Sequence, residues 1–138
     1  MVYTQFQVSS SSTQELIDIT SDINDIIKQE KISEGYCIVF VPHTTAAVTI
    51  NEGADPDVVH DILSTLSSLI PRDRPYLHAE GNSDAHIKTS LLGSSEHIII
   101  RNGRLLLGTW QHVFFFEGDG PRNRTVHIQL IESTGDAK

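Results

Sequence analysis

Cysteine is almost absent from this sequence of 138 residues, in which Cys37 is the only one. A single thiol excludes an intrachain disulfide, and its position in the apolar run YCIVFV favours a small buried side chain. No apolar run approaches the roughly 20 residues that a membrane-spanning helix needs, and the first residues, MVYTQFQVSSSS, lack the basic head and apolar centre of a signal peptide. We therefore expect a cytoplasmic protein without a membrane partner.

Positive charge is also scarce, because 10 lysines and arginines stand against 18 aspartates and glutamates, for a net charge of −8. This balance excludes broad, sequence-independent binding to nucleic acid, which needs a surface of cations to displace phosphate counterions. Arginine is nevertheless concentrated in the second half of the chain, as three close pairs: Arg72 and Arg74, Arg101 and Arg104, Arg122 and Arg124. Such pairs leave a small phosphorylated ligand as a possible partner.

The chain is long enough for one hydrophobic core but short for two, since 38% of its 138 residues are hydrophobic. We expect one domain over residues 1–138, with a flexible tail at 133–138. Near the N-terminus, alternating apolar residues predict a strand over 2–8. The capping-box pattern of Ser12 and Glu15 then predicts a helix, whose apolar stripe is Leu16, Ile19, Ile23, Ile26 and Ile27.

The middle of the chain predicts a buried strand and two helices. GYCIVFVP is a short, β-rich apolar run bounded by glycine and proline, which is typical of a buried strand. Asp55 before Pro56 predicts the start of a second helix that ends before Pro71. A short third helix is expected to begin at Asn82 or Ser83.

The last third of the chain predicts strands in succession. HIIIRNGRLLLG is typical of a β-hairpin, because Asn102 and Gly103 tolerate the positive φ of a type I′ turn. VFFFEGDGPRNRTVHIQLI is interpreted as a second hairpin with a longer loop. The expected fold class is therefore α+β, rich in antiparallel strands, with two main helices and one short helix. Because several strands are apolar on both faces, neighbouring subunits are expected to cover part of the surface.

Polar side chains gather in four segments, each at the end of an expected strand or helix. These segments are PHTTAAVTINE (42–52), HAEGNSDAHIK (78–88), GTWQHV (108–113) and EGDGPRNR (117–124). Loops held by rigid elements can place side chains for chemistry without satisfying core packing. The four segments are therefore the candidates for a functional site.

His43, His78 and His86 are the candidate ligands of a divalent metal ion. Neutral imidazole is the commonest ligand of zinc, and three such ligands leave an open position for water or substrate. Zinc is therefore favoured, and magnesium is possible. Glu80 and Asp84 could orient these rings by accepting their second N–H. The alternative is that each imidazole bonds only to backbone in a loop.

The start of the expected third helix offers groups for an anion. Backbone N–H groups at a helix start near Asn82 and Ser83 could receive a phosphate. The alternative for Asn82 is that it only forms a turn. For Asp84 the alternative is a helical i,i+4 ion pair with Lys88.

Arg122 and Arg124 are candidates for bidentate recognition of phosphate or carboxylate. The alternative is that they form salt bridges with Glu117 and Asp119, or with acids of another subunit. The sequence favours neither ligand recognition nor salt bridges for these two arginines.

The remaining candidates lie beyond a buried strand and in the segment GTWQHV. Thr44, Thr45, Asn51 and Glu52 offer hydroxyl, amide and carboxylate groups; the alternative is that they cap the turn before the Asp55 helix. Trp110 and Gln111 could form a stacking surface for a substrate ring. The alternative is that Trp110 is a core or interface residue and Gln111 a buried hydrogen-bonding residue.

In this order and over nearly the whole chain, PHTTAAVTINE, HAEGNSDAHIK, LGTWQ and EGDGPRNR resemble the YjbQ family. The resemblance implies a compact α+β sandwich that assembles as a homotrimer, with the polar motifs near subunit boundaries. It also implies a metal site carried by His43, His78 and His86.

The resemblance further implies secondary thiamine-phosphate synthase activity, a transfer that joins hydroxymethylpyrimidine diphosphate to thiazole phosphate with release of diphosphate. Such a reaction needs a divalent cation and cationic groups to hold the diphosphate, roles that a metal with Lys88, Arg122 and Arg124 could fill. The sequence departs from this chemistry in having no acidic DDxxD-like run for magnesium diphosphate. We expect a metal-dependent enzyme that acts on a small phosphorylated substrate.

Two other functions fit the same residues. In a metal-assisted hydrolase, a metal-bound water attacks a phosphoester or amide while Glu80 or Glu52 moves the proton. In a non-enzymatic trimeric binding protein, the site sequesters a small anion or metal and the histidines are structural. Turnover with added metal would separate the enzymes from the binding protein.

Overall fold

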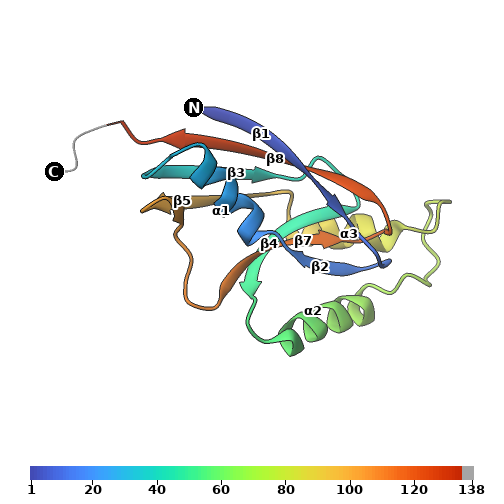
Figure 1. Ribbon diagram of the computed structural model, residues 1–138. Helices are drawn as coiled ribbons and strands as arrows, with labels where there is room; N and C mark the ends of the chain where they lie inside the picture. Colours follow the sequence, from blue (N-terminus) through green and yellow to red (C-terminus); the bar gives the residue numbers. More distant parts are fainter. Residues whose placement is uncertain (135–138) are drawn as a thin grey trace.

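The computed structural model describes residues 1–134, which form two antiparallel β-sheets and three helices (Figure 1). The strands are β1 (Val2–Ser9), β2 (Glu15–Asp18), β3 (Gly35–Phe40), β4 (Ala46–Glu52), β5 (Ser95–Arg101), β6 (Arg104–Leu105), β7 (Gln111–Glu117) and β8 (Asn123–Glu132). The helices are α1 (Thr20–Gln29), α2 (Pro56–Leu69) and α3 (Ser83–Leu92). None of these helices is long and apolar enough to cross a lipid bilayer.

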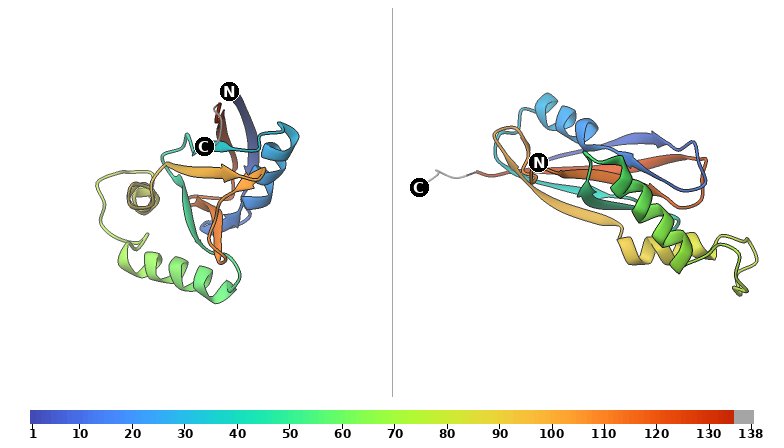
Figure 2. Two further views of the ribbon diagram at one scale, coloured as in Figure 1. Left: turned by 90° about the vertical axis from the view of Figure 1, so that its left-hand side faces the viewer. Right: turned by 90° about the horizontal axis from the view of Figure 1, so that it is seen from below.

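The larger sheet has the strand order β1-β8-β3-β5-β6, and the smaller has the order β2-β7-β4. Every pair of neighbouring strands is antiparallel. Figure 1 shows the larger sheet above the smaller one with α2 below, and Figure 2 shows α1 and α3 on opposite sides of the sheets. The predicted antiparallel α+β fold is confirmed.

The hydrophobic core lies between the two sheets and α1. Alternate residues of the strands point into it, and Ile19, the N-cap of α1, adds to the core with Ile23 and Ile27 of the helix at helical spacing. Strand β7 is buried at every position from Val113 to Glu117; it lies between β2 and β4 in the smaller sheet and contacts α1. By contrast, none of the 14 residues of α2 is fully buried, so its apolar stripe stays partly open to solvent.

The helix predicted from Ser12 does not form there, because the chain first makes strand β2. The Glu15 carboxylate does accept N–H groups, from Ser11 and Ser12, but it closes a turn before a strand. Leu16 then pairs with Phe116 of β7, and the helix begins only at Thr20. The local capping pattern was outweighed by strand pairing with a distant part of the chain.

Two further sequence interpretations were wrong. The segment expected to be a polar loop over 42–52 forms strand β4 from Ala46 onward, and β4 pairs with β7. The expected hairpin over 113–131 also does not form, because β7 belongs to the smaller sheet and β8 to the larger one. The connection crosses between the sheets so closely that a Cβ at Gly120 would lie 2.3 Å from the Ser12 carbonyl oxygen.

Other local predictions are confirmed. The Asp55 carboxylate accepts the Asp57 N–H at 2.9 Å, which caps α2 with Pro56 at its first position. Helix α3 follows Asn82, and the β5–β6 turn has Asn102 at φ 53° and Gly103 at φ 75°. Of the predicted tail, Ser133 donates its N–H to the Glu34 carbonyl at 2.9 Å, and residues 135–138 lie outside the described residues.

Candidate functional site

His43 lies in the loop between β3 and β4 and opens onto a pocket of about 390 Å³ that we call the His43 pocket. The pocket is lined by His43, Thr44, His86, Thr89, Ser90, Gly93 and Ser94. The His43 Nε2 atom accepts the backbone N–H of Thr125 at 3.0 Å, so a neutral ring carries its proton on Nδ1. Burial lowers the pKa of His43, and the charge of Arg124 lowers it further. His43 is therefore a neutral ring that can donate from Nδ1.

The other two candidate histidines lie together, His86 on α3 and His78 in the loop before it. The rings of His78 and His86 lie edge to face, with centroids 5.5 Å apart. His86 also lines a hollow of about 420 Å³ next to the His43 pocket, together with Tyr76, Leu77, His78, Ser83 and Ile87. Glu80 is exposed, and its Oε2 lies 3.8 Å from His78 Nε2, which is too long for a hydrogen bond.

The histidines fit a metal ion only in part. Within residues 1–134, no three histidine, cysteine, aspartate or glutamate side chains are grouped to hold one. His78 and His86 are close enough to supply two imidazoles. Ligation by His43 Nε2 would first have to break its hydrogen bond with Thr125. The three-histidine site therefore stays a prediction.

A buried ion pair between Arg124 and Glu117 lies near His43. The Arg124 guanidinium donates from Nε to Glu117 Oε1 at 2.9 Å and from Nη2 to Glu117 Oε2 at 2.5 Å. The same Nη2 donates to Thr45 Oγ1, and Ser10 Oγ donates to Glu117 Oε1. Burial alone would raise the pKa of Glu117, but these hydrogen bonds from Arg124 and Ser10 hold it below its usual value.

Asp119 forms a second ion cluster at the start of α3. Its carboxylate accepts hydrogen bonds from Arg122 Nη2 at 2.9 Å and Arg72 Nη2 at 3.1 Å. Asn82 Nδ2 also donates to it, so the Asn82 side chain does not cap α3, and Asn82 Oδ1 is buried with no partner among the described residues. Both arginines of EGDGPRNR thus form the ion pairs of the alternative reading, Arg122 with Asp119 and Arg124 with Glu117.

The predicted i,i+4 ion pair on α3 is present. Lys88 Nζ donates to Asp84 Oδ2 at 2.8 Å, and neither side chain has any exposed area. Gln14 Nε2 donates to the same Asp84 oxygen at 3.1 Å. Lys88 therefore packs inside the protein, where its side chain has no access to a ligand. Its catalytic role stays a prediction.

The structure divides the predicted site residues into two groups. Thr44, Thr45, Asn82, Ser83, Arg122 and Arg124 lie near the histidines, as described above. Asn51, Glu52, Trp110 and Gln111 lie at the far end of β4 and β7. A strand of seven residues separates the two groups by about 20 Å. In the far group, Trp110 is mostly exposed, and Glu52 Oε2 is buried without a partner among residues 1–134.

Sequence reasoning missed Ser10, Gln14 and Arg72, all of which bond to the buried carboxylates. Arg72 carried a signal, because it belongs to one of the three close arginine pairs. Ser10 and Gln14 carried none, since each meets its partner only through long-range contacts.

Two curled antiparallel sheets, three helices and a histidine- and arginine-rich end define a small α+β protein with a polar pocket beside α3. The family model described as UPF0047 protein YjbQ-like matches residues 4–133, and the chain belongs to this family. It is 51% identical over 127 residues to a UPF0047 protein of Methanocaldococcus jannaschii, covering 92% of each chain. It is 44% identical over 126 residues to UPF0047 protein YugU of Bacillus subtilis, covering 91% of this chain and 96% of YugU.

Solved structures show the same fold. An uncharacterised YjbQ/UPF0047 protein of Clostridium acetobutylicum superposes with a TM-score of 0.90 at 49% identity, over 93% of this chain and 99% of that one. A hypothetical protein of Aeropyrum pernix superposes with a TM-score of 0.91 at 35% identity, over 96% of this chain and all of that one (100%). These descriptions state no activity, so the function of the chain is a proposal.

Proposed function

We propose that the chain is an enzyme that acts on a small phosphorylated substrate bound in the His43 pocket. The observation that carries this proposal is the position of His43 and His86 on opposite elements of one pocket, beside the buried Arg124. Imidazole N–H and hydroxyl groups are the donors that a phosphate accepts, and the pocket combines both kinds.

His43 would donate to the phosphate directly, whereas Arg124 would act on it only from the buried ion pair with Glu117. His43 donates from Nδ1, because Thr125 holds its Nε2 as an acceptor. Arg124 does not donate to the phosphate, since Glu117 already accepts two of its hydrogen bonds and balances its charge. Thr44 is exposed at the pocket and offers a hydroxyl to the same ligand. These groups orient a phosphate without a large net positive charge.

A divalent cation would be held by His78 and His86, and zinc suits two imidazoles better than magnesium does. When bound, such a cation would neutralise phosphate charge. Glu80, exposed beside His78, is the carboxylate placed to accept a proton near this pair. Glu52 is too far from the histidines for that role in a single chain.

The finer form of the proposal, which the family resemblance implies, is the coupling of hydroxymethylpyrimidine diphosphate with thiazole phosphate. Both substrates are small and phosphorylated, and diphosphate is the leaving group. The competing possibility is hydrolysis of a phosphoester. Incubation of the purified protein and zinc with both thiamine precursors, and separately with simple phosphate esters, distinguishes these reactions by the product that appears.

Zinc titration by calorimetry tests the proposed cation site. We expect His86→Ala to weaken zinc binding about tenfold or more, because one of two imidazole ligands is lost. His60→Ala removes an exposed histidine on α2 and should leave zinc binding unchanged. Equal zinc binding by the wild type and His86→Ala would contradict the cation site.

Inorganic phosphate tests the proposed phosphate site separately from the cation site. Phosphate should raise the melting temperature of the wild type, by stabilising the native state through mass action. His43→Phe should lose this shift. If phosphate and zinc both bind but no substrate turns over, the chain is the non-enzymatic binding protein instead.

We also propose that the chain assembles as a homotrimer, in the cytoplasm. The support is the partly open apolar stripe of α2, where Val58, Ile62 and Leu66 line a hollow of about 400 Å³. Leu69, Leu77 and Leu91 are also exposed. Sedimentation equilibrium should give three times the 15.3 kDa mass of the chain, and Ile62→Glu should shift it towards the single chain. A wild-type mass of 15.3 kDa would contradict the trimer.

A further inference from the structure

The segment GTWQHV leads to a second cavity, about 20 Å from His43 along β4. This cavity has a volume of about 410 Å³ and lies between α1, the β5–β6 hairpin and the start of β7. Its lining includes Asn24, Arg101, Arg104, Leu107, Gln111 and His112. We call it the His112 cavity.

His112 is held by a carboxylate on the neighbouring strand. Its Nδ1 donates to Asp18 Oδ2 at 2.5 Å, and Asp18 Oδ1 accepts the Thr20 N–H at 3.0 Å. Because an ionised carboxylate can only accept, a neutral His112 ring keeps its proton on Nδ1 and has a free lone pair on Nε2. Burial alone would raise the pKa of Asp18, but the hydrogen bonds from Thr20 and His112 hold it below its usual value.

The His112 ring is also fixed by packing. A Cβ at Gly53 would lie 2.1 Å from His112 Cγ, so the ring rests directly on the Gly53 backbone. The ring also stacks on Phe114, with ring centroids 6.4 Å apart and planes tilted by 27°. A side chain fixed on three sides, yet about one third exposed, is preorganised to meet a ligand at a defined angle.

The other walls of the cavity indicate an anionic ligand with some apolar surface. Arg101 is paired with Glu34 at 2.9 Å, whereas none of the ion pairs among residues 1–134 involves Arg104. Gln111 Oε1 accepts the Gly108 N–H, which leaves its amide nitrogen as a donor. Leu107, half-buried, supplies part of the apolar wall.

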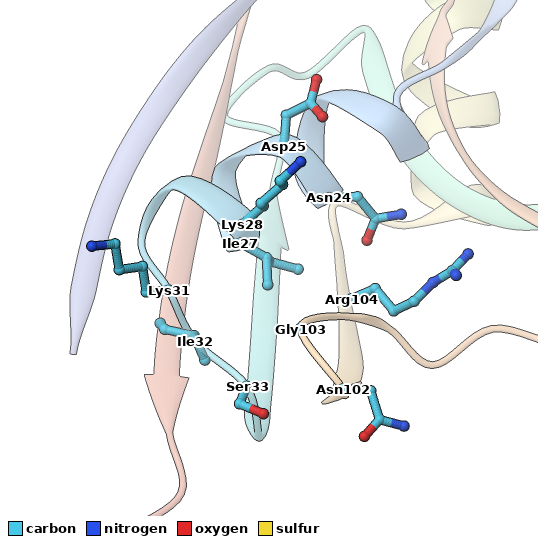
Figure 3. A pocket seen from close by; sticks show the side chains of 10 residues that line it. All are labelled: Asn24, Asp25, Ile27, Lys28, Lys31, Ile32, Ser33, Asn102, Gly103 and Arg104. Atoms are coloured by element: carbon cyan, nitrogen blue, oxygen red, sulfur yellow. The ribbon is translucent and has the colours of Figure 1, made fainter.

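An adjoining hollow of about 650 Å³ shares Asn24, Asn102 and Arg104 with the His112 cavity (Figure 3). Figure 3 shows Asn24 and Arg104 pointing to the same side, while Lys31 points away on the other side. The cationic side chains Lys31 and Arg104 of this hollow therefore point apart and do not enclose one ligand. Asn24 Oδ1 accepts the Leu105 N–H at 2.9 Å, which ties α1 to the hairpin at the boundary of the two spaces.

We propose that the His112 cavity binds a small hydroxylated anion, a hydroxycarboxylate or a hydroxyalkyl phosphate. The ligand hydroxyl donates to His112 Nε2, and its anionic group pairs with Arg104. Asp18 is a positioning residue that keeps the accepting nitrogen directed at the ligand. This site is independent of the His43 pocket, and its ligand needs no metal.

Nuclear magnetic resonance on the isotope-labelled full chain tests the site, with lactate and glycerol 3-phosphate as probes for the carboxylate and phosphate forms. We expect at least one probe to shift the amide signals of residues 101–112. Arg104→Met should weaken its binding roughly tenfold or more, as expected for a lost charge-assisted hydrogen bond. Arg74→Met removes an exposed arginine outside the cavity and should leave binding unchanged.

Propionate, which is lactate without its hydroxyl, tests the contact with His112. It should bind the wild type roughly tenfold more weakly than lactate, and His112→Gln should remove this difference if lactate is the bound form. For the phosphate form, propyl phosphate, which is glycerol 3-phosphate without its two hydroxyls, makes the same comparison. Ring nitrogen shifts should show the proton of neutral His112 on Nδ1, and Asp18→Asn should reduce the population of that tautomer.

The proposal is overturned if neither probe shifts residues 101–112, or if Arg104→Met binds as tightly as Arg74→Met. It is also overturned if the proton of neutral His112 lies on Nε2. Because zinc binding and the phosphate-induced shift that His43→Phe removes report on the histidine site, their failure would leave these results unaffected.

Discussion

Replacing Glu117 with glutamine is expected to lower the free energy of unfolding by about 3–5 kcal/mol. The substitution keeps the size of the side chain but removes the charge that faces Arg124. The Arg124 guanidinium would then be buried, 6% exposed, without a counter-charge. Chemical denaturation at neutral pH, fitted to a two-state transition, measures the loss.

Glu132→Gln is the matched control, since Glu132 is exposed at the end of β8 and takes part in no ion pair among residues 1–134. It should change the free energy of unfolding by less than about 0.5 kcal/mol. If Glu117→Gln lowers the free energy of unfolding by no more than this control does, the buried pair does not stabilise the fold.

The same pair makes stability depend on pH. Because the pKa of Glu117 is lower in the folded chain than in the unfolded chain, its contribution is complete above the unfolded value of about 4.3. It is lost as the pH falls through the folded pKa. The difference between wild type and Glu117→Gln should therefore shrink in acid, whereas a constant difference would point to packing alone.

Replacing Lys88 with methionine is expected to have the second large effect, about 3–5 kcal/mol. Asp84 would remain fully buried with Gln14 as its only neighbouring donor among the described residues, and its Oδ1 already lacks a partner. An ionised carboxylate in that position is costly, because its charge would be buried without a counter-charge. Thermal and chemical unfolding of the variant measure the loss.

The double variant Lys88→Met, Asp84→Leu distinguishes an ion pair from simple packing. Replacing both charges with apolar side chains of similar size is often neutral or stabilising, so the double variant should recover most of the stability lost by Lys88→Met. Lys28→Met, on the exposed part of α1, is the control and should cost little. Additive losses in the double variant would show that Asp84 and Lys88 contribute separately.

Local parts of the fold could be predicted because their causes are local. The cap of α2 at Asp55 and the positive φ values at Asn102 and Gly103 depend on residues within a few positions of each other. The Asp84–Lys88 pair is also local, since four residues of helix bring the two side chains to one face. Strand β2 could not be predicted this way, because its partner β7 lies about a hundred residues further along the chain.

In the candidate site, too, residue types could be predicted locally but their contacts could not. His43, His86 and the paired arginines were found from the residue types in four polar segments. Their roles depend on partners that are distant in sequence, such as Thr125 for His43 and Asp18 for His112. Which nitrogen of each ring is free to meet a ligand follows from those partners.

The sequence by itself determined the α+β class, the cap of α2, the turn of the β5–β6 hairpin and the family, because short-range geometry and residue order carry that information. Only the tertiary structure decided that β7 and β8 belong to different sheets and that the predicted site residues separate into two groups. The physical reason is that strand pairing and the hydrogen bonding of buried charges are chosen between distant segments, once the chain has closed around its core.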